Sequence, residues 1–349
     1  MSVKSVFPCV KVSAVLIFML FFQFVNAQTD FSEIDRKLDA SKKELGGNVV
    51  ALIYQDGKIV YQKAIGTDFN AKTQAPIGNA SQWLTAALVM SFVDQGKISL
   101  DDQVSKYLPI FSKYSKGYIT IKDCLAHVTG IESDPKSINP SNRKKFASLE
   151  EEVNDLASKK EILSNPGLEF RYGSVGLSIA GRVLEIVAKR SFEQLMQERI
   201  TRPLQMRNTS FSSFNAVNPS NGAVSTPTDY ISFLGMLLNK GMYNGKRILS
   251  EKAIEEMQTV RTTPSMMKFV PKVAEGYSYG LGAWSLQADE NGKATIMASP
   301  GLFGTWTMID FCRGYACVIL TKGDLPEEKK EIWMEVKRII ESRLVPNCK

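Results

Sequence analysis

The chain contains 349 residues, of which 44% are hydrophobic, so it can bury a large core in one domain or in two intertwined lobes. Its net charge is +7, but the basic residues are spread along the chain, and we expect no nucleic-acid partner. A single histidine, His127, argues against a histidine-rich metal site and against a Ser-His-Asp triad, so neither a metal nor a cofactor is expected.

Residues 1–27 have the pattern of a signal peptide. Lys4 and Lys11 supply positive charge, an apolar core covers residues 12–25, and the stretch ending at Ala27 suits a signal peptidase. A retained membrane anchor is the alternative, although the apolar run is short for a membrane span. We therefore expect a mature chain of residues 28–349 that has no stable membrane span and is periplasmic or secreted.

The mature chain begins with a predicted helix and a predicted hairpin. Residues 29–45 carry apolar side chains on one stripe, which is typical of an amphipathic helix. Residues 49–66 predict a β-hairpin, because two apolar runs flank the turn dipeptide Asp56-Gly57.

The next element is an apolar helix over residues 80–94. Its residues are small or apolar on every face, which predicts a helix buried in the middle of a domain. Asn79 stands where an N-cap residue is expected, and Gly96 stands where a left-handed residue after the helix end is expected.

Residues 75–109 around this helix resemble the serine β-lactamase and D,D-peptidase superfamily, in its class C and esterase-like branch. The resemblance implies an S-x-x-K motif, with a nucleophilic Ser at the mouth of the buried helix and a Lys one turn later. The matching residues in this chain are Asn79 and Gln82. The sequence therefore keeps the frame of the motif and lacks both of its chemical groups.

Two further stretches continue the resemblance. Residues 119–131 resemble the family's motif around a histidine, which implies a structural role for His127 at a helix-to-loop turn. Residues 165–174 resemble P-G-x-x-F-x-Y-S-N, whose Tyr moves protons and whose Asn holds the substrate amide. Tyr172 matches that Tyr, although packing alone could also explain the ring, and Ser174 replaces that Asn.

The C-terminal part returns to a strand pattern and ends in a helix. Strands are predicted over residues 279–286, 294–298, 304–311 and 315–321, and an amphipathic helix is predicted over residues 326–344. With strands at both ends and helices between them, we predict an α/β fold of the α+β type. The resemblance implies an antiparallel sheet lobe of residues 30–66 and 278–345, flanked by terminal helices, and an inserted helical lobe of residues 100–240.

The family's third motif, K/H-T/S-G, lies on one of these last strands. The best match is Ser299-Pro300-Gly301, so the cation is lost and Pro300 offers no hydroxyl to a substrate carboxylate. Ser174, Ser299 and Gly301 are the residues that match the family's substrate-binding positions. Proline also removes a strand N–H, which is tolerated mainly at a sheet edge.

The chemistry of the matched residues favours a protein without the family's activity. An Asn amide is not a nucleophile at neutral pH, and a Gln amide does not accept a proton as a base. The leading hypothesis is a catalytically inactive binding or scaffolding protein at the cell wall, whose ligand is a cell-wall peptide or a small carboxylate.

Two alternatives stay open. The first is an active hydrolase of the β-lactamase, D,D-peptidase or esterase type that uses unorthodox groups, with Tyr172 as nucleophile and Asn79 orienting water. The second is a folded remnant whose site is filled by side chains such as Trp83, Phe303 and Trp306. Covalent labelling tests the first alternative, and occupancy of the site by protein side chains tests the second.

Cysteine spacing predicts a disulfide bond in the last hairpin. Cys312 and Cys317 flank the segment of residues 313–316 between two predicted strands. If Gly314 and Tyr315 form a two-residue turn, the two cysteines face each other at a non-hydrogen-bonded pair, within disulfide reach. An oxidising compartment favours the Cys312–Cys317 bond, and a reduced pair is the alternative.

Overall fold

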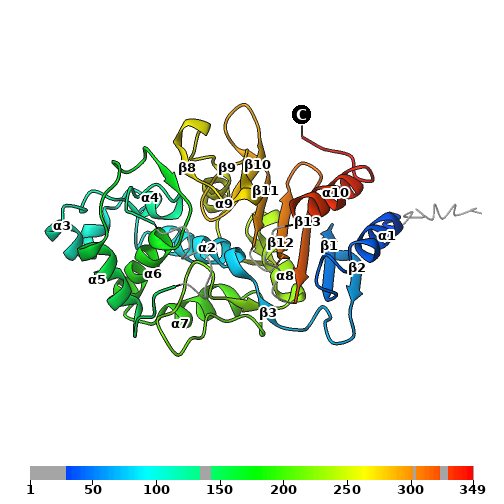
Figure 1. Ribbon diagram of the computed structural model, residues 1–349, viewed down its shortest axis with the longest axis horizontal. Helices are drawn as coiled ribbons and strands as arrows, with labels where there is room; N and C mark the ends of the chain where they lie inside the picture. The colour runs from blue at the N-terminus through cyan, green and yellow to red at the C-terminus, as the bar shows by residue number, and fades with distance from the viewer. Residues whose placement is uncertain (1–28, 134–142, 302–303, 323–328, 349) are drawn as a thin grey trace, which may run out of the picture.

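The computed structural model describes residues 29–133, 143–301, 304–322 and 329–348. The predicted signal peptide lies outside these residues. The main element is a seven-stranded sheet in the order β2-β1-β13-β12-β11-β10-β9, and every neighbouring pair in it is antiparallel (Figure 1). Its strands are β1 (Val49–Gln55), β2 (Lys58–Ile65), β9 (Ser278–Tyr279), β10 (Trp284–Ala288), β11 (Ala294–Pro300), β12 (Trp306–Asp310) and β13 (Tyr315–Thr321).

The two ends of the chain meet in this sheet. Strand β1 pairs with β13 from Val49↔Thr321 to Gln55↔Tyr315, so the predicted N-terminal hairpin and the predicted C-terminal strands share one sheet, as expected. The terminal helices α1 (Ser32–Ala40) and α10 (Lys330–Glu341) pack against each other beside the strands. Their apolar stripes supply the driving force, because each helix buries one face.

Helix α8 (Pro227–Leu238) also packs on the sheet, against β1 and β13. A Cβ atom added at Gly235 would lie 3.0 Å from the ring of Tyr54 on β1, which shows how closely the helix and the strand approach. The helical lobe expected over residues 100–240 is therefore shorter at its C-terminal end, because the apolar face of α8 is buried against strands rather than helices.

The helices between the two sets of strands pack mainly on one another (Figure 1, left side). Helix α6 is the centre of this lobe, since α4, α5 and α7 all contact it. The helices are α3 (Ile110–Lys113), α4 (Ile121–Leu125), α5 (Leu149–Lys159), α6 (Val175–Ala188) and α7 (Phe192–Met196), with the 3-10 turn η2 (Val104–Lys106) and the π-helical turn η5 (Gln197–Thr201).

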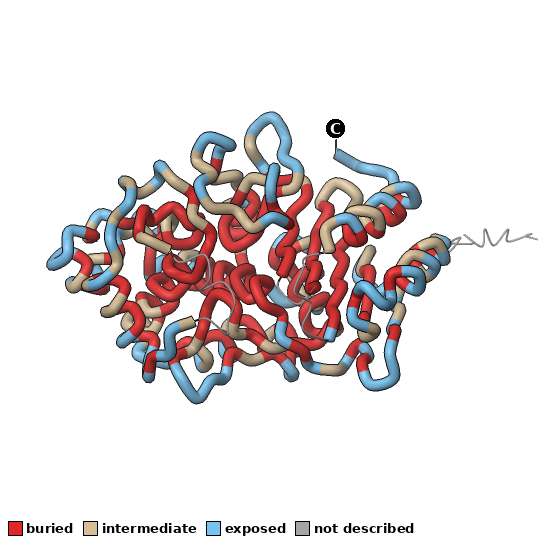
Figure 2. Tube along the Cα trace, viewed as in Figure 1, coloured by how far each residue is buried: buried red, intermediate tan, exposed pale blue. Residues whose placement is uncertain are grey.

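Helix α2 (Ser81–Val93) runs through the centre of the molecule, where Figure 2 shows an almost continuous buried trace. It contacts α6 of the helical lobe and α9 (Glu251–Gln258), which packs against β11. Every residue of α2 except Val93 is buried. The predicted all-round burial is therefore confirmed, and Gly96 has the expected positive φ of 65°.

Short elements complete the fold. Three two-stranded sheets pair β3 (Ala75–Pro76) with β5 (Val224–Ser225), β4 (Phe170–Arg171) with β8 (Met267–Phe269), and β6 (Met242–Tyr243) with β7 (Lys246–Arg247). Further 3-10 turns among the described residues are η1 (Gly78–Ala80), η6 (Pro264–Met266) and η7 (Lys272–Ala274).

The predicted Cys312–Cys317 disulfide is wrong. Cys312 is bonded to Cys348 near the C-terminus, with the two Cα atoms 4.9 Å apart, and Cys317 is a free, buried thiol whose pKa burial raises to about 12. The hairpin loop has four residues rather than two, since the register ends at Asp310↔Tyr315 and the Asp310 carboxylate accepts the N–H of Arg313 at 2.8 Å. Cys317 consequently pairs with Met308, away from Cys312.

Candidate functional site

The start of α2 differs from the prediction. Asn79 is not the N-cap residue; it lies in the 3-10 turn η1, and Ala80 is the N-cap of α2 with no side-chain capping bond. Asn79 is only 2% exposed, and its Oδ1 atom is buried with no hydrogen-bond partner in the described part of the chain. The residue that matches the family nucleophile is therefore an amide with an unused acceptor.

Hydrogen bonds from Ser81 and Tyr230 hold the start of α2 in place. Ser81 Oγ donates to the carbonyl of Gly78 at 2.6 Å and accepts the N–H of Ala223 at 3.1 Å. Tyr230, from α8 on the sheet, donates its O–H to the carbonyl of Ala80 at 2.8 Å. These bonds hold the first turn of α2 between the segment before α8 and the sheet.

Gln82, at the position of the family lysine, is held by three side chains. Its Oε1 accepts the O–H of Tyr279 at 2.8 Å and lies 2.9 Å from Nε2 of His127. Its Nε2 donates to Ser220 Oγ at 3.0 Å. Gln82 is 1% exposed, so the amide takes part in an internal network of neutral hydrogen bonds.

His127 follows Ala126, the C-cap of α4, at the predicted helix-to-loop turn, and has a left-handed conformation with φ of 56°. Its carbonyl accepts the N–H of Arg171 at 3.0 Å, which ties the turn to β4. Burial lowers the pKa of His127 to about 3, so the imidazole is neutral. Because Gln82 Oε1 can only accept, this geometry assigns the imidazole proton to Nε2.

Three aromatic rings surround this imidazole. The Tyr172 ring lies 4.9 Å from His127, the Tyr279 ring 5.0 Å and the Phe170 ring 5.8 Å, measured between centroids. Trp284 packs against these three rings rather than against the imidazole. Burial and the neighbouring Tyr172 raise the pKa of Tyr279 well above its ordinary value, so Tyr279 acts as a hydrogen-bond donor.

One glycine lets Tyr279 reach Gln82. Gly282, between β9 and β10, has a φ of 81°, and a Cβ atom there would lie 2.4 Å from the Cβ of Ala86 and 2.8 Å from the carbonyl of Gln82. A larger residue would push the strand edge away from α2. The glycine therefore permits the close approach that positions Tyr279.

Ser220 connects the network to the helical lobe. Ser220 Oγ donates to the carbonyl of Gly173 at 3.2 Å, next to Tyr172 and Ser174. Asn218 Oδ1 accepts the N–H of Ser220 at 3.1 Å, and Thr85 on α2 donates to the carbonyl of Pro219 at 2.6 Å. Polar side chains on successive turns of α2 thus bind one short segment, residues 218–223.

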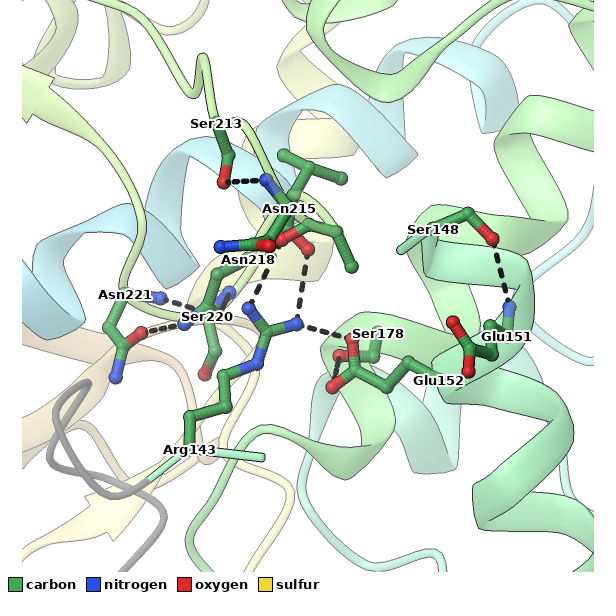
Figure 3. A network of polar contacts seen from close by, with 12 residues as sticks. Arg143, Ser148, Glu151, Glu152, Ser178, Ser213, Asn215, Asn218, Ser220 and Asn221 are labelled. Atoms are coloured by element: carbon green, nitrogen blue, oxygen red, sulfur yellow. Dashed lines mark hydrogen bonds and ion pairs between the residues drawn. The ribbon is translucent and has the colours of Figure 1, made fainter. Parts of the chain in front are cut away.

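Figure 3 shows how this segment continues into a buried ion pair. Arg143 donates to the carbonyls of Ala216 and Val217, at 3.3 and 3.1 Å, and pairs with Glu152 of α5. Glu152 also accepts the hydroxyl of Ser178 at 3.3 Å. Burial raises the pKa of Glu152, and the charge of Arg143 opposes that effect.

The structure also brings the third motif to the start of α2. A Cβ atom added at Gly301 would lie 3.2 Å from the carbonyl of Ile77, just before Asn79, and the Gly301 N–H donates to the carbonyl of Thr305 at 2.8 Å. Ser299 is buried in β11 opposite Thr307. The Thr305 hydroxyl is buried and has no partner within the described residues.

Two other predicted residues take structural positions. Ser174 is the N-cap of α6, but its side chain makes no capping bond. Pro300 is the last residue of β11, where the missing N–H does no harm because pairing with β10 ends earlier, at Ala298.

Two of the three aromatic residues suggested to fill the site, Trp83 and Trp306, lie within the described residues. Trp83 points toward α8, with its ring 6.2 Å from that of Phe233, and Trp306 is buried at the end of β12 nearest Pro300. Phe303 lies outside the described residues.

Sequence reasoning missed Tyr279 and Ser220 as partners of Gln82 and gave His127 only a structural role. Ser220 lies 138 residues from Gln82 and Tyr279 lies 197 residues from it, so no local spacing connects them. The one sequence signal for a partner of Gln82 was His127, because it lies within a stretch that resembles the family.

The sequence is similar to two named bacterial proteins. It is 29% identical over 194 residues to "Protein flp" of Staphylococcus aureus strain MW2, a match that covers 51% of this chain and 37% of that protein. It is 23% identical over 345 residues to a "Putative D-alanyl-D-alanine carboxypeptidase" of Salmonella agona, covering 77% of each. The chain thus spans much less than two thirds of the length of the staphylococcal relative.

The fold is similar to that of a "putative beta-lactamase" from Bacteroides dorei, with a TM-score of 0.79 and 26% identity. That match covers 89% of this chain and 99% of the other. Within the described residues, no helix is long and apolar enough to cross a membrane. The sequence profile of the beta-lactamase family matches residues 34–339. With the predicted antiparallel fold confirmed and the profile covering most of the sequence, the chain belongs to the beta-lactamase family.

Proposed function

We propose that this protein is a catalytically inactive member of its family that binds a ligand without forming a covalent bond to it. The observation that carries the proposal is the state of Gln82. The residue at the position of the family base is an amide, and that amide is held by Tyr279, His127 and Ser220.

The chemistry of acyl transfer explains why this arrangement supports inactivity. The family reaction needs a nucleophilic oxygen and a base one turn away. Asn79 supplies no such oxygen, and Gln82 has no lone pair that is basic at neutral pH. His127 does not replace the base, because its Nε2 carries the proton shared with Gln82 and its pKa is about 3.

Two polar atoms at the other end of the site support a binding role. The buried acceptor of Asn79 and the buried hydroxyl of Thr305 lie on the two elements that meet at Gly301, and neither has a partner in the described residues. A peptide N–H or a protonated carboxyl group would satisfy such an acceptor. The Salmonella relative's name and the predicted signal peptide favour a cell-wall peptide, with a small carboxylate as the second candidate, in a periplasmic or secreted protein.

A second candidate function is an unorthodox hydrolase that uses Tyr172. The contact between the rings of Tyr172 and His127 favours it, since the pair lies beside the matched residues. In that reaction Tyr172 is the nucleophile and Asn79 orients water.

The test is covalent labelling and turnover by the purified mature protein. We expect no adduct with a fluorescent penicillin and no hydrolysis of a chromogenic cephalosporin above background, with an active class C β-lactamase as the positive control. Loss of catalytic groups that act as a unit commonly lowers kcat by about a million-fold. Turnover that Tyr172→Phe abolishes and Asn79→Ala lowers would establish the unorthodox hydrolase instead.

Restoring the motif sharpens this test. Neither Asn79→Ser nor Gln82→Lys alone should permit labelling, and the double variant should label at most weakly. Ser174 and Pro300 still differ from the family's substrate-binding residues, and the introduced ammonium group would enter a site built around a neutral amide. Binding is measured separately, as a shift in Tm on adding a D-alanyl-D-alanine peptide, and the absence of any shift with peptides or β-lactams would argue against a binding role.

A further inference from the structure

Two cysteines compete for a bond to Cys312. In the folded protein Cys312 is bonded to Cys348, and the two residues are 36 apart in the sequence. Cys317 is a free thiol, although only residues 313–316 separate it from Cys312. The cysteine that follows Cys312 most closely in the sequence is therefore not the partner that the folded protein uses.

Before the chain folds, the local pair is favoured. The entropic cost of closing a loop grows with its length, so Cys312 meets Cys317 more often than it meets Cys348, 36 residues away, by about tenfold. Gly314 lies inside the short loop and makes it easier to close. Synthesis runs from the N-terminus, so Cys312 and Cys317 are also present together before Cys348 is added. Loop length and order of synthesis thus act in the same direction.

The folded structure excludes the local bond. Cys317 lies within β13, between Ile53 of β1 and Met308 of β12, and is only 2% exposed. Cys312 lies beyond the end of this strand pairing, in the loop that follows Asp310. A bond to Cys312 would draw Cys317 away from its two neighbouring strands, so a chain with the local bond cannot complete the pairing of β13.

Tertiary contacts instead bring Cys348 to Cys312. The N–H of Asn347 donates to the carbonyl of Cys312 at 2.7 Å, and Arg313 Nε donates to the carbonyl of Leu344 at 3.2 Å. Leu344 is buried, so the segment after α10 is held against the hairpin loop. These contacts form only when the sheet and α10 have packed, so the native bond depends on folding and the local bond does not.

We propose that the native disulfide forms by exchange from a Cys312–Cys317 intermediate, and that the partner of the protein in this step is a thiol–disulfide isomerase. A disulfide oxidant makes the local bond. A thiolate of the isomerase attacks Sγ of Cys312, the bond to Cys317 breaks, and the Cys317 thiolate takes up a proton. The Cys348 thiolate then attacks Sγ of Cys312 and releases the isomerase thiolate. One disulfide exists before and after the exchange, which therefore consumes no oxidant.

Burial makes this exchange run in one direction. In the folded protein burial raises the pKa of Cys317 to about 12, so its thiol stays protonated and does not attack the native bond. Catalysis by a partner is favoured because an ordinary thiol is mostly protonated at neutral pH, and unassisted rearrangement takes minutes to hours. This inference goes beyond the function proposed above and uses none of the residues of that site.

Trapping the disulfides during refolding of the full mature protein tests the proposal. Reduced protein in urea is diluted into oxidised glutathione, and samples are blocked with N-ethylmaleimide and digested with trypsin. Cleavage after Arg313 and Arg343 gives a different cross-linked pair of peptides for each bond. We expect the Cys312–Cys317 bond to exceed the Cys312–Cys348 bond by about tenfold in the first samples. The native bond as the first species would overturn the proposal.

An added catalyst and two variants separate exchange from direct pairing. Protein disulfide isomerase should shorten the time to the native bond in the unmodified protein and in Cys124→Ala, the matched control, because Cys124 is also a free, buried thiol. Cys317→Ala should lose this acceleration, since no local bond remains to be exchanged. No acceleration of the unmodified protein, or equal acceleration of Cys317→Ala, would contradict the proposal. If Cys317→Ala does not fold, the order of the two bonds in the unmodified protein decides.

Discussion

The two ends of the family site differ in how their polar groups are satisfied. Around Gln82, each polar atom of the amide has a partner, and the bonds continue through Ser220 toward the helical lobe. Around Asn79, the amide oxygen and the hydroxyl of Thr305 are buried without partners in the described residues. The position of the family base is thus held by hydrogen bonds within the fold, and the unpaired atoms near the position of the family nucleophile support the proposal of a ligand there.

The largest effect on stability is expected when the hydrogen bonds around Gln82 are removed. Gln82→Met keeps the volume of the side chain but leaves Tyr279, His127 and Ser220 without their shared partner. Tyr279 and His127 still lie 3.2 Å apart and Ser220 keeps its bond to Gly173, so the loss of the three bonds to the amide should lower the free energy of unfolding by about 3–4 kcal/mol, roughly 1 kcal/mol for each bond. Urea unfolding measures this, with Gln74→Met as the control because Gln74 is exposed. A change as small as that of the control would show that Gln82 is not structural.

Stability should be nearly as sensitive to loss of the ion pair between Arg143 and Glu152, at the outer end of the same network. Arg143→Met leaves the carboxylate of Glu152 buried without its counter-charge, which should lower the free energy of unfolding by about 3 kcal/mol. The matched control is Lys144→Met, since Lys144 is exposed and its partner Asp155 keeps a second ion pair with Lys159, so the loss should be less than about 1 kcal/mol. Equal losses of stability in the two variants would show that the buried ion pair of Arg143 contributes no more than the ion pair of Lys144.

The pH dependence of stability tests the neutral imidazole in this network. The pKa of His127 is lowered to about 3 in the folded protein, whereas the unfolded chain binds the proton near pH 6.5. Between these values the unfolded state holds more protons, so stability falls as the pH drops, by up to a factor of ten in the folding equilibrium constant per pH unit.

The matching variant is His127→Gln, which removes the chain's single histidine. Unfolding midpoints from pH 7 to pH 4 should fall less steeply in the variant than in the unmodified protein. Parallel curves would show that His127 does not carry the acid sensitivity, and carboxyl groups would then account for it.

The smallest effect on stability is expected from a substitution at Asn79. Asn79→Ala removes an amide whose oxygen makes no hydrogen bond within the described residues, so the free energy of unfolding should change by less than about 1 kcal/mol. The same variant should weaken the binding of any peptide ligand at this position. A loss of stability equal to that of Gln82→Met would remove the distinction between the two ends of the site.

Several parts of the fold follow from local sequence patterns. The all-round apolar run of α2, the hairpin of β1 and β2, and the strands near the C-terminus were predictable, because side-chain periodicity reports directly on burial. The helix start was not. Asn79 has the composition of a cap, but tertiary bonds to Ser81 and Ala80 shift the first turn and leave Asn79 inside η1.

The disulfide is a second feature that local sequence patterns did not predict. Spacing alone allowed a two-residue turn between Cys312 and Cys317, whereas the carboxylate of Asp310 stabilises a four-residue loop. That shift of register turns Cys317 into the core and leaves Cys312 beside the C-terminal segment, where Cys348 reaches it.

The sequence by itself therefore determined the family frame, the order of helices and strands, and the absence of Ser and Lys from the positions of Asn79 and Gln82. Only the tertiary structure decided what Gln82 does instead, because its partners come from segments 45, 138 and 197 residues away. Local patterns encode which faces are buried, but the pairing of buried polar atoms depends on which distant segments the packed core brings together.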